Sequence, residues 1–327
     1  MDHIEYQHIL PSSKKPWVAL IALFLILAGS ALFIGQVLIM LLIAVIPELT
    51  LSTMSLAMTN PEAYPEMRMS ILLVQGVSAL SAFIIAPVIY HYSLVGGSPL
   101  AFIPKRATSI LPVLMVVFIT ISFMAVNSIF IELNANVEFP AFLEGFEAWA
   151  QQMEKRMELL TKYLTKIDSA GYFIVAFIVV AIIPAIGEEW MFRGYLQPLL
   201  TKMTGNIHVG VWLAAIIFSA FHVQFFGFLP RLLLGALFGY LFVWSGSLLY
   251  AIIGHFINNG LSIIFLYLDQ QGMLGFDAES TEALPWVAII PMGIVFVFLL
   301  YTFYDYFKRN NFDSGEDITN EKLAESI

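Results

Sequence analysis

The sequence predicts an all-α membrane protein, a polytopic bundle of about eight transmembrane helices. Of its 327 residues, 59% are hydrophobic and only 12% are charged. Several runs of about 20 residues carry almost no charge, and each such run, folded as a helix, is long enough to cross the ~30 Å hydrocarbon core of a bilayer. A segment with amphipathic periodicity follows the third run. We therefore expect a helix bundle with one additional amphipathic helix in the 132–170 loop.

Hydropathy divides the chain into eight expected spans. They are 17–46, 70–94, 109–131, 171–200, 207–226, 228–246, 248–268 and 286–306. The first apolar run is longer than that of a cleaved signal peptide and follows a long polar segment, so we expect it to remain in the protein. The spans suggest four regions: an N-terminal three-span membrane region (1–131), the amphipathic helix (132–170), a four-span core (171–268), and the last span with an acidic tail (269–327).

Charge and cysteine content narrow the classes of function. The net charge is −9, and the acidic tail contributes Asp313, Glu316, Asp317, Glu321 and Glu325. The chain has no basic cluster that could hold a nucleic-acid backbone, so nucleic-acid binding is not expected. The sequence contains no cysteine, which excludes disulfides, a thiol nucleophile and thiolate metal ligands.

The distribution of basic residues predicts the orientation in the membrane. One set of loops carries Lys14, Lys15, Lys105, Arg106, Lys202, Lys308 and Arg309. The opposite side has Arg68, Arg231 and the four basic residues of the long 132–170 loop. Because short cytoplasmic loops are enriched in Lys and Arg, we expect both termini to be cytoplasmic in a bacterial inner (plasma) membrane.

The 132–170 segment differs from the spans. Apolar residues recur there at steps of three and four, at Phe142, Phe146, Trp149, Met153, Met157, Leu160 and Leu164. This period is typical of an amphipathic helix. Such a helix could lie on the bilayer face or pack against the bundle, and it could also act as a lid or a substrate-docking element.

Ionisable side chains are costly in hydrocarbon unless they face protein or water, yet three of the expected spans carry them. Glu188, Glu189 and Arg193 follow the apolar segment IIPAIG, His222 ends FSAFH (218–222), and His255 precedes Asn259 in HFINN (255–259). A count of 1.5 Å per residue along the helices allows these side chains to meet in one layer near the midplane.

Helical spacing suggests how these residues relate to one another. Glu189 and Arg193 are four residues apart and can form an ion pair, whereas Glu188 points about 100° away and has no partner at that spacing. His255 and Asn259 share one helix face, and Phe218 lies one turn before His222. A carboxylate, two imidazoles and an amide together could hydrolyse a bond or relay protons. Packing ion pairs and inter-helical hydrogen bonds are the structural alternatives.

Three motifs in these segments resemble those of a known family. GEEWMFRG (187–194) resembles EExxxR, FSAFH resembles FxxxH, and HFINN resembles HxxxN of the CPBP family. This family comprises the CAAX proteases and bacteriocin-processing enzymes related to the type II CAAX prenyl endopeptidases. The motifs occur in the family order, within a core of about 171–268.

The resemblance implies an intramembrane endopeptidase that acts on a peptide or membrane-protein substrate. It implies that Glu188 activates water, that Glu189, His222 and His255 assist, and that Asn259 stabilises the oxyanion. Arg193 matches the motif arginine, and Phe218 the motif phenylalanine. Serine and aspartyl intramembrane proteases fit less well, because neither GxSG nor GxGD is present.

Two questions of chemistry stay open at the level of sequence. Glu189, His222 and His255 could ligate Zn²⁺, but the sequence lacks HExxH, so we favour a metal-free glutamate mechanism. A proton-coupled transporter could use Glu188, His222 and His255 as a relay, with Gly187 and Gly254 interrupting their spans, although paired broken helices in matching halves are absent. A membrane scaffold or immunity factor would keep the same residues without cleavage.

Overall fold

The chain is helical in the computed structural model, which describes residues 15–98 and 109–324, the last fifteen of these by backbone alone. No β-strand occurs within those residues. Lys14, Lys105, Arg106 and the side chains of the acidic tail, Asp313, Glu316, Asp317, Glu321 and Glu325, lie outside what the structure describes. The described ranges still include every expected span.

Seven helical stretches in the described part are long and apolar enough to cross a membrane. They are Pro16–Val45, Pro65–Val95, Ile110–Ala135, Ala170–Thr204, Phe228–Ser245, Leu248–Gln270 and Trp286–Arg309. Each corresponds to one predicted span. The prediction of an all-α, multi-pass membrane bundle is confirmed.

The remaining predicted span, 207–226, is too long and needs correction. Helix α11 (Ile207–Ala220) has 14 residues and is therefore ~21 Å long, which is less than the hydrocarbon thickness. The chain then forms an irregular loop at 221–227 before α12 (Phe228–Ser245) returns toward the end where α11 began. The aromatic residues of FHVQFFG raise the hydropathy of this loop, but Phe225 packs against Phe139 and Phe146 and the helix does not continue.

Prolines shape two of the long spans. The second span comprises α4 (Arg68–Leu80), η5 (Ser81–Ile85), α5 (Ala86–Tyr90) and η6 (His91–Val95). The fourth comprises α8 (Ala170–Phe177), η9 (Ile178–Ile182), α9 (Ile183–Glu189), η10 (Trp190–Leu196) and α10 (Gln197–Thr204). The π-helical turns η5, η9 and η10 each end two residues before a proline. Because proline has no N–H and its ring clashes with the carbonyl four residues earlier, the α-helical ladder cannot continue there.

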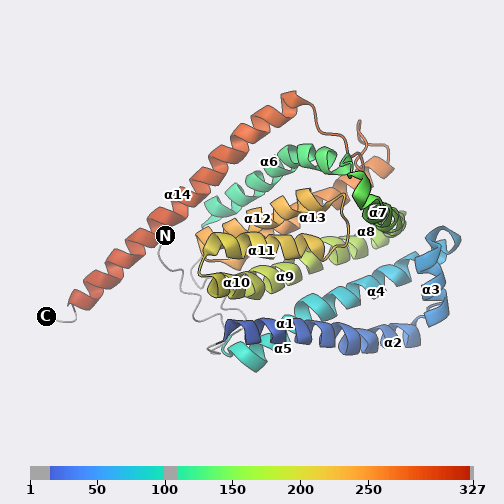
Figure 1. Ribbon diagram of the computed structural model, residues 1–327, viewed down its shortest axis with the longest axis horizontal. Coiled ribbons are helices and arrows are strands. Elements are labelled where there is room, and N and C mark those ends of the chain that lie inside the picture. Colours follow the sequence, from blue (N-terminus) through green and yellow to red (C-terminus); the bar gives the residue numbers. More distant parts are fainter. Residues whose placement is uncertain (1–14, 99–108, 325–327) are drawn as a thin grey trace.

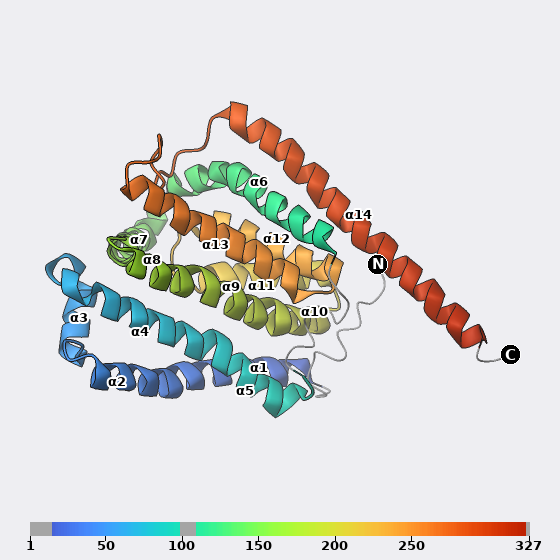
Figure 2. The same cartoon turned by 180° about the vertical axis from the view of Figure 1, so that it is seen from behind.

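The spans are arranged in layers (Figures 1 and 2). The first span, α1 (Pro16–Gly29), η2 (Ser30–Ile34) and α2 (Gly35–Val45), pairs with α4–α5 in the outer layer on one side. Helices α8–α10 come next, followed by α11, α12 and α13 (Leu248–Gln270). Helix α6 (Ile110–Ala135) covers the opposite side, and the long α14 (Trp286–Ala324) packs along α6. The fourth span is thus enclosed by the bundle.

Short elements close one end of the bundle. Helix α3 (Leu51–Thr59) and the turns η3 (Pro61–Ala63) and η4 (Pro65–Met67) connect the first two spans. Helix α7 (Glu144–Thr165), preceded by η8 (Ala141–Leu143), lies crosswise to the spans at this same end (Figures 1 and 2). These elements mark the end of the bundle away from the first residues of α1.

Helix α7 confirms the amphipathic helix expected in 132–170, and it packs against the bundle. Its last turn is docked, since Leu164 is buried and the Tyr163 hydroxyl donates a hydrogen bond to the Tyr64 carbonyl at 2.6 Å. Arg68 of α4 forms an ion pair with Asp168 just after α7. Phe142, the first of the apolar residues predicted for this helix, lies outside it. It precedes α7 and is 84% exposed.

Candidate active site

The fourth span brings two adjacent glutamates to the centre of the bundle, and they differ in burial. Glu188 and Glu189 end α9, and Arg193 follows within η10. The side chain of Glu189 has 0% of its surface exposed and that of Arg193 has 1%, whereas that of Glu188 retains 14%. Of the two carboxylates, only that of Glu188 retains access to a water molecule.

Arg193 is held by three neighbouring elements. Its Nη1 donates to Glu189 Oε1 at 2.8 Å, which confirms the expected ion pair. Its Nη2 donates to the carbonyl of Gly235 in α12, also at 2.8 Å. The guanidinium lies 4.8 Å from the ring centre of Phe218 in α11, within the range of a cation–π contact. The motif arginine and phenylalanine therefore contact each other and join α9, α11 and α12 around Glu189.

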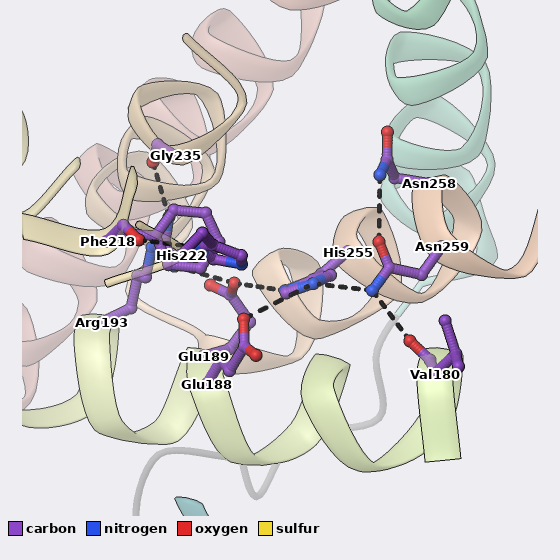
Figure 3. Close-up of polar contacts among 10 residues, drawn as sticks. All are labelled: Val180, Glu188, Glu189, Arg193, Phe218, His222, Gly235, His255, Asn258 and Asn259. Carbon is purple, nitrogen blue, oxygen red and sulfur yellow. Dashed lines mark hydrogen bonds and ion pairs between the residues drawn. The ribbon is translucent and has the colours of Figure 1, made fainter. Parts of the chain in front are cut away.

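His255 faces both glutamates on one side and Asn259 on the other (Figure 3). Its Nδ1 is 2.8 Å from Glu189 Oε1, and its ring stacks on Phe238 at 5.4 Å. Because a carboxylate can only accept this hydrogen bond, Nδ1 carries a proton, and a lone pair, when the ring has one, is on Nε2. Nε2 is 3.9 Å from Glu188 Oε2. Glu188 thus has a polar neighbour on another helix, whereas the spacing of residues along its own helix predicted no partner.

Asn259 holds His255 from the opposite side. Asn259 follows His255 by one helical turn. The Nδ2 of Asn259 lies 3.1 Å from His255 Nε2 and donates to the Val180 carbonyl at 3.0 Å. Asn258 donates to the Oδ1 of Asn259 at 3.0 Å. Both Nδ2 hydrogens are therefore engaged in this conformation, and the oxyanion role implied for Asn259 would require one of these bonds to open.

The Val180 carbonyl is available to Asn259 for a reason visible in the sequence. In an uninterrupted α-helix, the N–H of residue 184 would donate to the carbonyl of residue 180. Residue 184 is a proline near the start of α9, so that donor does not exist. The carbonyl accepts from Asn259 instead, and the interruption of the fourth span thereby anchors α13.

His222 approaches from the loop after α11. Its Nδ1 lies 2.9 Å from the Phe218 carbonyl, and its ring is 5.2 Å from the Phe218 ring. Phe218 also contacts the His255 ring, at 6.1 Å, so Phe218 touches both imidazoles. Since a carbonyl only accepts, the proton of His222 is on Nδ1, and Nε2 has a lone pair. Among described residues, His222 forms no hydrogen bond with the other five polar site residues.

The proposed zinc ligands do not form a metal site in this arrangement. No group of three or more His, Asp or Glu side chains within the described residues is placed to hold a metal ion. The Oε1 atom of Glu189 already accepts from Arg193 and His255, and His222 forms no hydrogen bond with either of the other two residues among those described. Glu189, His222 and His255 therefore do not fit a zinc ligand set here.

Gly187 and Gly254 do not interrupt their spans, contrary to expectation. Both lie inside continuous helical segments, α9 and α13. A Cβ at Gly187 would lie 2.7 Å from Phe83 Cβ, and one at Gly254 would lie 2.9 Å from Phe238 Cε1. These glycines permit close helix packing on either side of the polar cluster.

Sequence reasoning missed several residues around this site. Gln224 follows His222 by two residues, and Arg231 was counted only as a loop charge, yet both are half-buried and hydrogen-bonded to each other. Glu154 of α7 joins them through Gln224. The position of Arg231 at the edge of an apolar span could have indicated that it faces the site. No sequence pattern could have indicated this for Glu154, which lies in another element.

Comparison with known proteins assigns a family to the region that contains these residues. Residues 170–261 match the family described as "Type II CAAX prenyl endopeptidase Rce1-like". The chain carries a CPBP-family domain over these residues. This domain contains all of the motif residues and coincides with most of the core expected at 171–268. The resemblance stated from the three motifs is therefore confirmed at the level of family.

One curated relative of this CPBP-family domain is the "Uncharacterized protein YpbD" of Bacillus subtilis (strain 168). It is 32% identical over 77 residues, which cover 22% of this chain and 36% of the relative. The match thus spans about a third of the relative's length. No solved structure matches the chain.

Proposed function

We propose that this multi-pass membrane protein is an intramembrane endopeptidase in which Glu188 activates the attacking water. One observation carries the proposal. The partly exposed carboxylate of Glu188 lies 3.9 Å from an imidazole that is itself oriented by the buried Glu189 and Arg193. A base beside an oriented partner is the arrangement that general acid–base hydrolysis needs, and the family domain surrounds it.

The Nδ1 protons of the two imidazoles suggest how water is held. Glu188 would accept one hydrogen of the water, and the His222 Nε2 lone pair would accept the other. The water oxygen then attacks the scissile carbonyl as its proton passes to Glu188. Glu188 and His222 can each accept one hydrogen of the water because the proton of His222 is on Nδ1, which leaves Nε2 as an acceptor.

The same geometry supports a route for the proton and for oxyanion stabilisation. Transfer of the proton from Glu188 to His255 Nε2 would end the ability of that nitrogen to accept from Asn259. The released Nδ2–H of Asn259 could then donate to the oxyanion. The imidazolium would be stabilised by Glu189 and would donate its Nε2 proton to the leaving amine. The second hydrogen of the water stays on the attacking oxygen and leaves with the product carboxylic acid.

The partners and location follow from the same proposal. The substrate is a peptide or a segment of a membrane protein that reaches the site from the bilayer or the cytoplasmic side. The protein would reside in a bacterial inner membrane with both termini in the cytoplasm, in keeping with the basic loops and a bacterial relative. Within it, residues 171–268 would form the catalytic region of the four-region organisation.

The transporter alternative loses one of its supports. It relied on Gly187 and Gly254 as helix interruptions, and both helices continue through these residues. The scaffold alternative requires no turnover. Both remain outcomes of the test below.

The first test is a cleavage assay on purified protein in detergent. Fluorogenic peptides with and without a lipid anchor would be compared for wild type, Glu188→Gln and the exposed-site control Glu158→Gln. We expect Glu188→Gln to lose at least ~10²-fold in turnover, the scale of a general base. It should keep the elution volume and thermal unfolding profile of wild type, because the substitution preserves size and the neighbouring hydrogen bonds.

A chelator-treated sample addresses the metal question in the same assay. Turnover that survives chelation supports the glutamate mechanism, and turnover lost on chelation would indicate a metal. A Glu188→Gln variant with wild-type turnover would contradict the assignment. If wild type cleaves no peptide in the panel, the transporter and scaffold alternatives become stronger.

A further inference from the structure

A chain of hydrogen bonds links the amphipathic helix to the loop that carries His222. Gln224 Nε2 donates to Glu154 Oε1 of α7 at 3.1 Å. Arg231 Nη2, at the start of α12, donates to Gln224 Oε1 at 3.1 Å. The single amide of Gln224 is therefore bonded on both sides, by an acceptor on α7 and a donor on α12. It is the centre of a Glu154–Gln224–Arg231 relay.

The position of Gln224 in the chain ties this relay to His222. Only Val223 separates the two residues, and it has φ of 53°. A β-branched side chain rarely adopts this left-handed conformation, so surrounding contacts must enforce it. The 221–227 loop therefore has little tendency to hold this shape alone. The hydrogen bonds on both sides of Gln224 fix the residue that follows the strained position.

Aromatic packing also holds the same loop against the start of α7 and the segment before it. The Phe225 ring lies 4.9 Å from Phe139 and 5.5 Å from Phe146. Gly227 gives Arg231 room, because a Cβ there would lie 2.9 Å from Arg231 Nη2. The relay is thus one part of an interface through which α7 covers the loop.

The charge of Arg231 gives the relay a second consequence. The guanidinium is close enough to Glu188 and His222 to interact electrostatically with both. Its Nη1 has no hydrogen-bond partner among the described atoms. The hydrogen bond from Nη2 to Gln224 therefore restrains the orientation of a cation whose charge acts on both Glu188 and His222.

We propose that Gln224 is a positioning residue for the proposed hydrolysis, through which α7 sets the place of His222 and of the Arg231 charge. The inference rests on the proposed function. It assigns to α7 a part in the chemistry. This helix ends at Thr165, before the family domain begins at residue 170, and none of the three motifs lies in it.

Turnover of Gln224→Ala tests the proposal. We expect kcat to fall ~10- to 100-fold, the scale of a misplacement of about 1 Å, with KM within about twofold of wild type and an unchanged unfolding temperature. A merely structural residue would lower the unfolding temperature along with kcat. Gln151→Ala is the matched control, because Gln151 bonds only to Glu147 on the exposed face of α7.

A double variant provides the rescue. Gln224→Glu alone places two carboxylates together and should lose activity. In Glu154→Gln/Gln224→Glu, the amide at 154 donates to the carboxylate at 224, which still accepts from Arg231, so both hydrogen bonds return with the same total charge. We expect kcat to recover to within about threefold of wild type. Failure to recover would overturn the relay.

A second readout does not depend on turnover. The rate at which diethyl pyrocarbonate modifies His222, followed by mass spectrometry, should rise several-fold in Gln224→Ala. His208 serves as the internal control, because it bonds to Tyr240 away from the loop. An unchanged His222 rate, or wild-type kcat in Gln224→Ala while Glu188→Gln is inactive, would overturn this inference alone. An active Glu188→Gln would instead overturn the proposed function.

Discussion

At the scale of single residues, two adjacent glutamates acquire different tasks from their surroundings. Glu189 points into protein and is bonded by Arg193 and His255. Glu188 points about 100° away on the same helix and keeps part of its surface exposed. The spacing of the sequence predicted the first pairing, because residues four apart share a helix face. It could not predict the contact of Glu188 with His255, which depends on how two helices cross.

The buried pair makes a direct prediction for stability. Glu189→Ala leaves the guanidinium of Arg193 buried without its counter-charge, which should cost about 3–5 kcal/mol of folding free energy. Thermal and denaturant unfolding in detergent would measure the loss. Glu189→Gln, which keeps an acceptor, should lose less.

A double replacement separates folding from chemistry at this position. In Glu189→Leu/Arg193→Met no buried charge remains, so most of the stability should return, while cleavage stays absent because His255 has lost the acceptor of its Nδ1 proton. If Glu189→Ala were as stable as wild type, water would have to reach Arg193, which would conflict with the burial of the Glu189–Arg193 pair.

At the scale of elements, helix irregularities position the site. Pro184 removes the donor for the Val180 carbonyl, and Asn259 of α13 uses that carbonyl. Hydropathy located the spans because it averages over many residues. It could not locate the π-helical turns, which depend on single prolines and on neighbouring helices that satisfy the freed carbonyls.

Close packing at Gly187 gives a prediction for the element. Alanine there would place its Cβ 2.7 Å from Phe83 Cβ and 2.9 Å from the Phe83 carbonyl oxygen, and backbone cannot yield easily. We expect Gly187→Ala to lose about 1–3 kcal/mol of stability, as overpacked sites do, and to lose activity because α9 shifts. Gly171→Ala is the control, since a Cβ at Gly171 meets nothing within 4 Å. Equal unfolding temperatures for the two variants would contradict this account of the packing.

At the scale of the whole molecule, the sequence predicted the class of fold and most boundaries. Seven of the expected spans correspond to observed helices, because an uncharged run has few stable alternatives in a bilayer. The eighth, 207–226, holds the shorter helix α11 (Ile207–Ala220), and its predicted end was wrong because aromatic residues in the 221–227 loop raise the hydropathy there. The relay from Glu154 to Arg231 joins residues that are far apart in the chain, and no local pattern indicates such a contact.

The proposed orientation can be tested on the intact protein. The chain has no cysteine, so single introduced thiols give no background. Phe142→Cys, at a residue 84% exposed beside α7, should react with a membrane-impermeant maleimide on the periplasmic or outer side of intact cells or spheroplasts. Lys202→Cys at the opposite end of the bundle should react only after permeabilisation. The reverse pattern would place both ends of the bundle the other way round.

The short α11 has a consequence for the surrounding lipid. A helix of 14 residues that starts at one membrane surface ends before it reaches the other, so we expect the irregular backbone after it to lie within the hydrocarbon depth. Such backbone persists only against protein or water. Since the helix is several ångströms shorter than the hydrocarbon core, we expect the adjacent leaflet to thin toward its polar end. The bilayer beside α11 would therefore be locally thinned. Water and an extended peptide backbone could approach Glu188 through this region without crossing the full hydrocarbon barrier.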